Sequence, residues 1–394
     1  MAEIVASRRR VLTALMIAQI MAGLAHGVTF SMGAILAADI AGPAWGGAAS
    51  TVTTIGAGLW AVPLARIVER RGRRASLSTG LALGSVGALS AMLGAQTRIF
   101  GFLLVGFFFL GAAVAMNLQS RFAAADIASD EHKGRDISLV VWSTTIGAVL
   151  GPNLFGPTET LGAALGLANF AGAYVVCIAA QWIAILVLQV MLRPQPAPVA
   201  ARATSLPKVK LAEHPVVMSA IVTNAFSHFA MIAIMSMTAV HMHSHGASFT
   251  LIGLTISFHV GGMFGLAPVF GYLADTVGAR QTMLLGVGMT LLSALLLVFW
   301  AGNEKIVVVA LALLGLGWSA TLVGSSAVVA TAAPPEYKAG LQGRSDLLMN
   351  LTGALGGVVA GPVVSMLGMP AMAGMVLVLI TAVTVFTAAL RRRA

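Results

Sequence analysis

The chain has 394 residues, of which 58% are hydrophobic and only 9% are charged, and its mean hydropathy is +0.93. Soluble domains carry roughly 25% charged residues, so this composition indicates a membrane protein with many spans. The net charge is +10, but the basic residues lie in short loops between apolar segments, which excludes nucleic acid as the expected partner. The single cysteine, Cys177, excludes a disulfide framework and a CxxC metal site.

Apolar segments long enough to cross a bilayer predict an all-α membrane protein with twelve transmembrane helices. They cover residues 11–38, 44–67, 75–95, 99–125, 137–157, 168–192, 215–241, 249–273, 281–301, 306–333, 345–367 and 370–390. The first segment is too long for the apolar region of a signal peptide. We expect two six-helix bundles, residues 1–193 and 215–394, joined by a Pro-rich basic linker over 194–214.

Basic residues set the expected orientation, because they concentrate on the cytoplasmic side of membrane proteins. With the N-terminus in the cytoplasm, the basic residues at 8–10, 70–74, 133–135 and 391–393 all fall inside. Only Arg98 and Lys305 then fall outside. We therefore expect a multi-pass protein of the bacterial inner membrane with both termini in the cytoplasm.

Two loops repeat across the halves: ARIVERRGRR at 65–74 and GYLADTVGAR at 271–280. This six-plus-six repeat resembles the major facilitator superfamily, whose signature after the second span is G-x-L-x-D-R-x-G-R-R. The first copy departs from it, with Ala65 for glycine and Glu69 for aspartate. The resemblance implies that the loops gate transport, although the arginines alone also mark topology. The gating residues that it implies are Glu69, which keeps the acidic charge, with Arg70, Gly72, Arg73, Arg74, Gly271, Asp275, Gly278 and Arg280.

Motifs for catalysis are missing from the sequence, which has no Walker loop, GxSxG or HExxH. We therefore expect neither an enzyme nor a cofactor. No Asp or Glu lies in the middle of a predicted span, so a carboxylate proton relay has no obvious residue and organic cations are disfavoured as substrates. His26, His228 and His259 would be the titratable groups within the spans.

Soft ligands lie together on two consecutive spans. Asn224, His228, Met231 and Met235 fall within about 60° of one another on one helical face. His259 and Met263, four residues apart, share a face of the next span. Sulfur and imidazole without carboxylate favour a soft ion, above all Cu(I). Methionine also fills packing gaps, and a buried histidine also forms helix–helix hydrogen bonds, so packing remains the alternative.

MxxxM followed by HxxxM in these spans resembles the CcoA-type copper importers, a branch of the superfamily that supplies copper for cytochrome oxidase assembly. The resemblance implies a metal site of Met231, Met235, His259 and Met263, with copper as the transported substrate. Spans one, four, seven and ten line the cavity in this superfamily, and they add the candidates Met16, Gln19, His26, Asn224, His228 and Met237. We expect two outer clusters to capture copper, formed by His241, His243, His245, Met366, Met369, Met372 and Met375.

The sequence thus favours a monomeric copper importer that rocks between two states in the lipid bilayer, its copper arriving bare or as a small chelate. A transporter of a small organic compound, or of a metal chelate such as a siderophore, is the first alternative. A membrane sensor that uses the fold without transport is the second.

Overall fold

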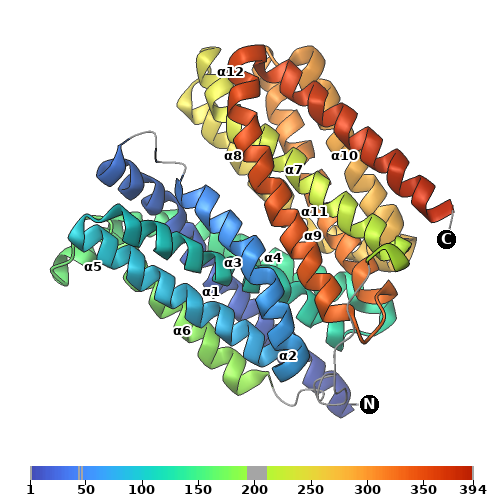
Figure 1. Cartoon of the computed structure of the whole chain (residues 1–394), viewed down its shortest axis with the longest axis horizontal. Coiled ribbons are helices and arrows are strands. Elements are labelled where there is room, and N and C mark those ends of the chain that lie inside the picture. Colours follow the sequence, from blue (N-terminus) through green and yellow to red (C-terminus); the bar gives the residue numbers. More distant parts are fainter. Residues whose placement is uncertain (1, 43–44, 46–47, 193–210, 393–394) are drawn as a thin grey trace. The chain divides into compact units, whose positions relative to one another are not determined.

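The computed structural model describes residues 2–42, 45, 48–192 and 211–392, and within these residues all regular structure is helical (Figure 1). The helices of the first half are α1 (Ala2–Ala41), α2 (Ala48–Thr97), α3 (Phe100–Ile127), α4 (Lys133–Asn153), α5 (Phe155–Ala164) and α6 (Gly172–Met191). Those of the second half are α7 (Pro215–Ser244), α8 (Phe249–Phe264), α9 (Ala267–Leu273), α10 (Ala279–Trp300), α11 (Glu304–Ala332) and α12 (Lys338–Arg392). Short turns η2 (Asp130–His132), η4 (Leu211–Glu213) and the π-helical η5 (Ala274–Gly278) complete the described elements.

Twelve crossings account for the apolar helices. Eight stretches in the described residues are long and apolar enough to span a membrane, and the pair α4–α5, bent by 65°, makes nine. Three of the nine, of 50, 47 and 52 residues, are more than twice the roughly 20 residues that one crossing needs. Counting two crossings in each of these three adds three to nine and gives twelve, which confirms the prediction.

Glycine marks the points where two of the long helices reverse. Gly72 in α2 has φ 83° and ψ 173°, and Gly368 in α12 has φ 82° and ψ 170°. Side chains rarely tolerate such positive φ values, so glycine is the residue that allows the reversal. Figure 1 shows α12 folded back on itself as a hairpin. In the third long stretch, Gly278 with φ 120° separates η5 from α10.

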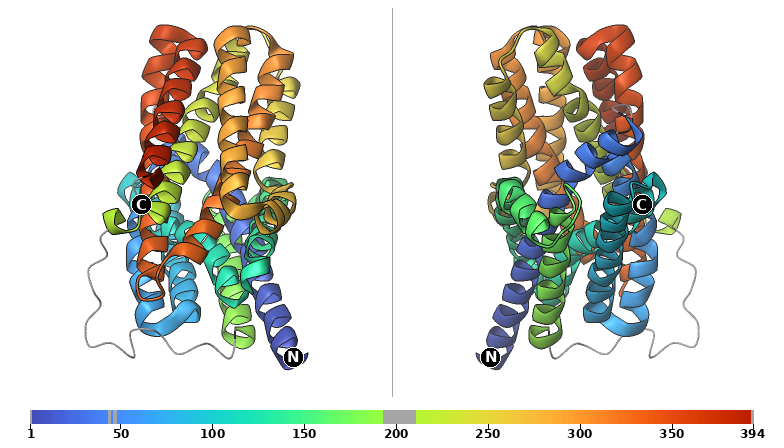
Figure 2. Two further views of the ribbon diagram at one scale, coloured as in Figure 1. Left: turned by 90° about the vertical axis from the view of Figure 1, so that its right-hand side faces the viewer. Right: turned by 90° about the vertical axis from the view of Figure 1, so that its left-hand side faces the viewer.

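One compact unit contains α1, α2, α3, α5 and α6, with α2 packed along α3 and α1 along α6 (Figures 1 and 2). Small residues let α2 and α3 approach closely: a Cβ added at Gly111 would lie 2.5 Å from the backbone nitrogen of Ala57. Larger buried side chains such as Leu103, Phe107 and Tyr174 fill the remaining core. Close van der Waals packing of this kind holds membrane helices together, because lipid offers no hydrophobic driving force between them.

The other compact unit contains α7 to α11 and most of α12, and α11 is its central helix, packed against α7, α8 and α10. A Cβ at Gly286 on α10 would lie 2.5 Å from the carbonyl oxygen of Gly317 on α11. The buried α11 face carries Trp318, Ser319 and Thr321. The polar side chains of α11 therefore lie where the backbones of α10 and α11 approach each other closely.

The two units exchange short segments of sequence. The first consists of Met1–Ala128, Ser143–Pro207 and Pro335–Leu347, and the second of Ser129–Trp142, Lys208–Pro334 and Leu348–Ala394. The predicted division into bundles of residues 1–193 and 215–394, with a linker over 194–214, does not include this exchange. Residues 194–210 of that linker lie outside the described residues, and 211–213 form η4.

Candidate functional site

The signature loop of the second half ends in a carboxylate that caps another helix. Asp275 in η5 accepts the backbone N–H of Gly134 at 2.6 Å and that of Arg135 at 2.9 Å, both in the first turn of α4. The first turn of a helix has free N–H groups and a positive dipole end, so a carboxylate is the matching partner. The Asp275 side chain is only 5% exposed, and the Arg135 guanidinium lies 3.9 Å from it.

This cap depends on two glycines of the second unit. A Cβ at Gly134 would lie 2.5 Å from the carbonyl oxygen of Gly271 and 2.7 Å from the Asp275 carboxylate. The motif glycine at 271 thus gives α4 the room to place its N–H groups on the acid. Gly278 provides the positive φ that starts α10, whereas Arg280 is exposed.

The first copy of the signature repeats the arrangement inside the first unit. Glu69 contacts the backbone N–H of Gly340 in the first turn of α12. A Cβ at Gly343 would lie 2.5 Å from the Ala65 Cβ, so the glycine missing at 65 is compensated by one on the facing helix. Gly72 forms the break, Arg70 is exposed and Arg74 is half-buried.

Arg73 is the arginine of this loop that forms an ion pair. Its Nε lies 2.8 Å from Asp126 on α3, and its guanidinium also donates to Gln342 on α12. Lys338, the first residue of α12, lies 3.1 Å from the same Asp126. The start of α12 is thus held by charge as well as by its capped N–H groups.

A second acid–base pair, between Arg121 on α3 and Asp346 on α12, was not identified from the sequence. The two are 2.6 Å apart and are 1% and 0% exposed, respectively. The sequence placed Asp346 at the start of a span beginning at 345, whereas α12 begins at Lys338, so that Asp346 lies inside the helix. Two loosely corresponding stretches of the halves, KGRD at 133–136 and QGRSD at 342–346, are the sequence signal for this region. Buried charges are costly unless paired, which makes this contact a fixed point of the unit.

The residues predicted to bind copper are largely buried. Met231, His259 and Met263 are buried, and Met235 is half-buried. His259 donates from Nδ1 to the carbonyl oxygen of Leu311 at 2.8 Å, and its Nε2 has no hydrogen-bond partner. Within the described residues, no group of three or more His, Cys, Asp or Glu could hold a metal ion.

His228 belongs to an aromatic group in the same unit. The indole Nε1 of Trp318 donates to His228 Nδ1 at 2.8 Å, joining α7 to α11. Phe264 from α8 packs edge-on against Trp318, with ring centroids 5.7 Å apart. The backbone of Gly353 on α12 lies against the imidazole, where a side chain would clash.

The other predicted cavity residues lie in two places. On α1, Gln19 is buried and donates to Asn117 at 2.7 Å and Thr144 at 2.8 Å, whereas Met16 is half-buried and His26 is exposed. On α7, Asn224 donates to the Met349 sulfur at 3.3 Å, and its carbonyl oxygen is buried without a hydrogen-bond partner. Met237 is half-buried. The structure thus groups Gln19 with neutral polar partners within the first unit.

The outer clusters do not form uniform surfaces. Met366 is 80% exposed, but Met369 and Met372 are fully buried and Met375 is half-buried. The break at Gly368 explains the difference, because it separates Met366 from the other three. At the end of α7, His241 is buried and His245 is exposed. The side chain of His243 lies outside the described residues.

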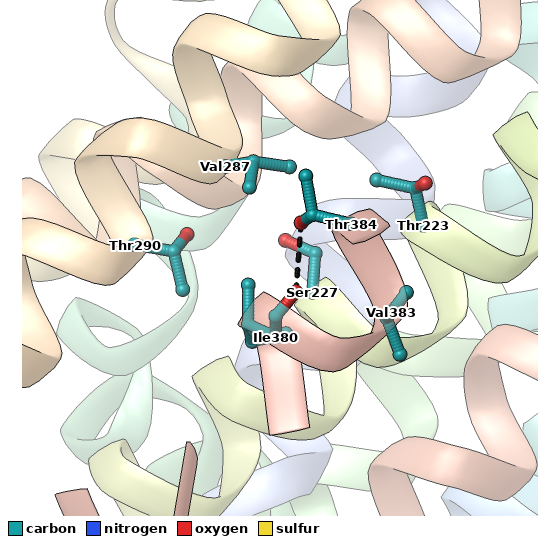
Figure 3. A pocket seen from close by; sticks show the side chains of 7 residues that line it. All are labelled: Thr223, Ser227, Val287, Thr290, Ile380, Val383 and Thr384. Atoms are coloured by element: carbon teal, nitrogen blue, oxygen red, sulfur yellow. Dashed lines mark hydrogen bonds between the residues drawn. The ribbon is translucent and has the colours of Figure 1, made fainter. Parts of the chain in front are cut away.

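A pocket in the second unit lies between α7, α10 and α12, and Figure 3 shows its seven lining residues. Three of its four hydroxyl groups are bound to carbonyl oxygens of their own helices: Thr223 to Ser219, Thr290 to Gly286 and Thr384 to Ile380. The pocket leaves no space for a water molecule. These contacts make the pocket a narrow seam between packed helices.

The twelve crossings, the repeated signature loops and their capped helices define a multi-pass membrane transport protein. Residues 15–240 and 217–394 match the model of the Major Facilitator Superfamily, and the chain belongs to this superfamily. Its members are transporters and not enzymes.

Two relatives cover nearly the whole chain. The uncharacterized MFS-type transporter YdeG of Bacillus subtilis is 35% identical over 373 residues, which cover 91% of this chain and 86% of YdeG. The riboflavin transporter RfnT of Brucella anthropi is 26% identical over 371 residues, covering 92% of this chain and 90% of RfnT. The fold is similar to that of the transporter FucP, with a TM-score of 0.75, 15% identity and coverage of 97% and 98%.

Proposed function

We propose that this protein is a secondary transporter that carries a small, uncharged aromatic compound across the bacterial inner membrane by alternating access. The observation that carries the proposal is the group formed by His228, Trp318 and Phe264. His228 and Trp318 lie on the seventh and tenth spans, which line the cavity in this superfamily. Phe264 is half-buried, so part of the aromatic group is accessible.

The chemistry of this group suits a neutral ring. Indole and phenyl rings stack on flat aromatic compounds or pack edge-on against them. His228 accepts a hydrogen bond at Nδ1, so the neutral imidazole carries its proton on Nε2. The unpartnered Asn224 carbonyl and Ser319 hydroxyl add polar groups without charge to the same unit. The relative RfnT is named for riboflavin, which has a flat heteroaromatic ring, and this supports the substrate class.

Uptake of radiolabelled riboflavin and of other neutral heteroaromatic compounds tests the proposal in cells with and without the protein. Trp318→Phe keeps a ring but leaves His228 Nδ1 without its donor, at a cost of roughly 1–3 kcal/mol. We expect about tenfold weaker apparent affinity. Trp300→Phe, at an exposed position on α10, is the matched control and should leave uptake unchanged. Normal uptake in Trp318→Phe, or no uptake of any aromatic compound, would overturn the proposal.

Copper is a second candidate substrate, and one observation favours it. The Leu311 carbonyl holds the Nδ1 proton of His259, which leaves a lone pair on the buried Nε2. A metal-binding imidazole commonly has this arrangement. Met231 and Met263 are buried thioethers of the same unit, and such neutral ligands suit Cu(I).

Copper uptake separates the two candidates. If copper is the substrate, Met231→Ala and His259→Ala each lower uptake of labelled copper sharply, silver competes and zinc does not. In that case Trp318→Phe has little effect. Copper uptake that is equal in cells with and without the protein would remove this candidate and leave the aromatic substrate.

The capped signature loops are proposed to hold one state of the transport cycle. In this proposal the acids Glu69 and Asp275 stabilise the starts of α12 and α4 in that state, and the loss of these contacts accompanies the change of access. We further propose that both termini are cytoplasmic and that the protein works as a monomer within the lipid bilayer.

A further inference from the structure

Two histidine rings lie in contact, tilted against each other, at the end of α7 and away from the aromatic group. His241 and His245 are one helical turn apart, and their ring centroids are 4.2 Å apart with an angle of 47° between the planes. The His241 ring is 7% exposed, whereas His245 lies at the surface. The buried His241 ring therefore lies beside an exposed His245 ring, and solvent reaches the pair from the His245 side.

Backbone carbonyls fix the protonation of both rings. His241 Nε2 lies 2.8 Å from the carbonyl oxygen of Ala301, and His245 Nδ1 lies 2.9 Å from that of His241. A carbonyl oxygen only accepts, so both of these nitrogens donate their protons. In the neutral rings, His241 Nδ1 and His245 Nε2 are left with lone pairs. Histidines that bind metal typically hold their other N–H on a carbonyl or carboxylate in this way.

We propose that His241 and His245 form a binding site for one transition-metal ion of the Zn²⁺, Ni²⁺ and Cu²⁺ group. An ion about 2.0–2.1 Å from each ligating nitrogen lies about 3 Å from each imidazole centroid, so two rings on adjacent coordination positions have centroids roughly 4–5 Å apart, and the observed 4.2 Å fits this range. His245 is the first residue after α7, four positions beyond His241, and histidines four residues apart are a known pairing for such ions. Water completes the coordination. Without a carboxylate the pair does not suit Mg²⁺ or Ca²⁺.

This proposal does not depend on which substrate the protein transports. Ala301 is the C-terminal cap of α10, so His241 also joins the end of α7 to the end of α10. An ion held by the pair would therefore bind where two helix ends meet. The sequence predicted that this pair belongs to an outer histidine cluster with His243, whose side chain lies outside the described residues.

Titration of the purified full-length protein with Zn²⁺ and Ni²⁺ tests the site by calorimetry. His245→Ala removes an exposed ligand without disturbing the Ala301 contact, and we expect at least tenfold weaker binding of one ion. His132→Ala, in η2, removes another histidine and is the matched control, with unchanged binding. Equal binding in His245→Ala and the unaltered protein would overturn the proposal.

Cu²⁺ resonance spectra provide a second readout. Two coordinated imidazoles split the Cu²⁺ electron paramagnetic resonance signal by two nitrogens. In His245→Ala the pattern should change to that of one coordinated imidazole. His241→Gln keeps an amide donor for Ala301 and should likewise lose one imidazole, while the protein stays folded. His243→Ala should leave the spectrum unchanged. Loss of binding in His243→Ala alone would place the ion on other ligands and overturn the proposal.

Discussion

The carboxylate of Asp275 accepts the backbone N–H of Gly134 at 2.6 Å, so a loop acid from the second half of the sequence caps a helix from the first half. Glu69 and Gly340 form the reciprocal contact, in which an acid of the first half caps a helix of the second. Each copy of the signature therefore supplies a carboxylate that caps the start of a helix in its own unit. In each case the acid meets free N–H groups at a helix start.

Asp275→Asn tests whether this cap controls transport. Asparagine keeps the size and one acceptor but loses the charge, and a hydrogen bond to a charged group is worth roughly 1.5–3 kcal/mol. We expect slower transport in proteoliposomes, with substrate affinity nearly unchanged, because Asp275 is not proposed to touch substrate. A variant that binds substrate poorly but cycles normally would contradict the gating role.

Gly134→Ala tests the close approach beneath the cap. Its Cβ would lie 2.5 Å from the Gly271 carbonyl oxygen, and overpacking of this kind costs about 1–3 kcal/mol. We expect a lower thermal midpoint in detergent and reduced transport. Gly288→Ala on α10, where a Cβ meets nothing within 4 Å, is the control and should be neutral or slightly stabilising. Equal midpoints for the two variants would mean that α4 shifts freely.

The buried pair of Arg121 and Asp346 predicts a strong dependence on both partners. Removing one leaves an uncompensated buried charge at a cost of about 3–5 kcal/mol, so Asp346→Leu alone should sharply lower the unfolding midpoint. The double variant Arg121→Met with Asp346→Leu removes both charges and should recover much of the loss. If the double variant is no more stable than Asp346→Leu, the pair is not the source of the effect.

Cysteine labelling tests the orientation. Cys177 is fully buried and should not react, which gives a low background in the unaltered protein. A cysteine introduced within 246–248 should react with an impermeant reagent from the periplasm. One introduced within 200–205, in the linker outside the described residues, should react only after the cells are opened. The reverse pattern would invert the topology.

Apolar length and loop motifs were enough to predict a helical protein with many membrane spans, because a membrane helix needs only a long run of apolar residues. They were not enough for α12, because hydropathy does not reveal that the helix begins at Lys338 with a paired acid inside it. The motif singled out Asp275, but its partner Gly134 became visible only in three dimensions.

Side-chain spacing was a weaker guide to the ligand candidates. The sequence grouped Met366, Met369, Met372 and Met375 by their three-residue spacing, and the break at Gly368 separates Met366 from the other three. His241 and His245 are in contact although His245 lies just beyond Ser244, the last residue of α7. The bond between His228 and Trp318 joins residues 90 apart in sequence, which no local pattern could indicate.

The exchange of segments between the two compact units has a consequence for how such chains can be recombined. A hybrid made by joining the first half of one relative to the second half of another at residues 194–214 would mix the partners of both caps and of the buried pair. Taking Ser129–Trp142 and Pro335–Leu347 from the relative whose unit each packs into would preserve them. Among relatives, substitutions in these two segments are therefore expected to accompany substitutions in the half of the sequence that each segment packs against.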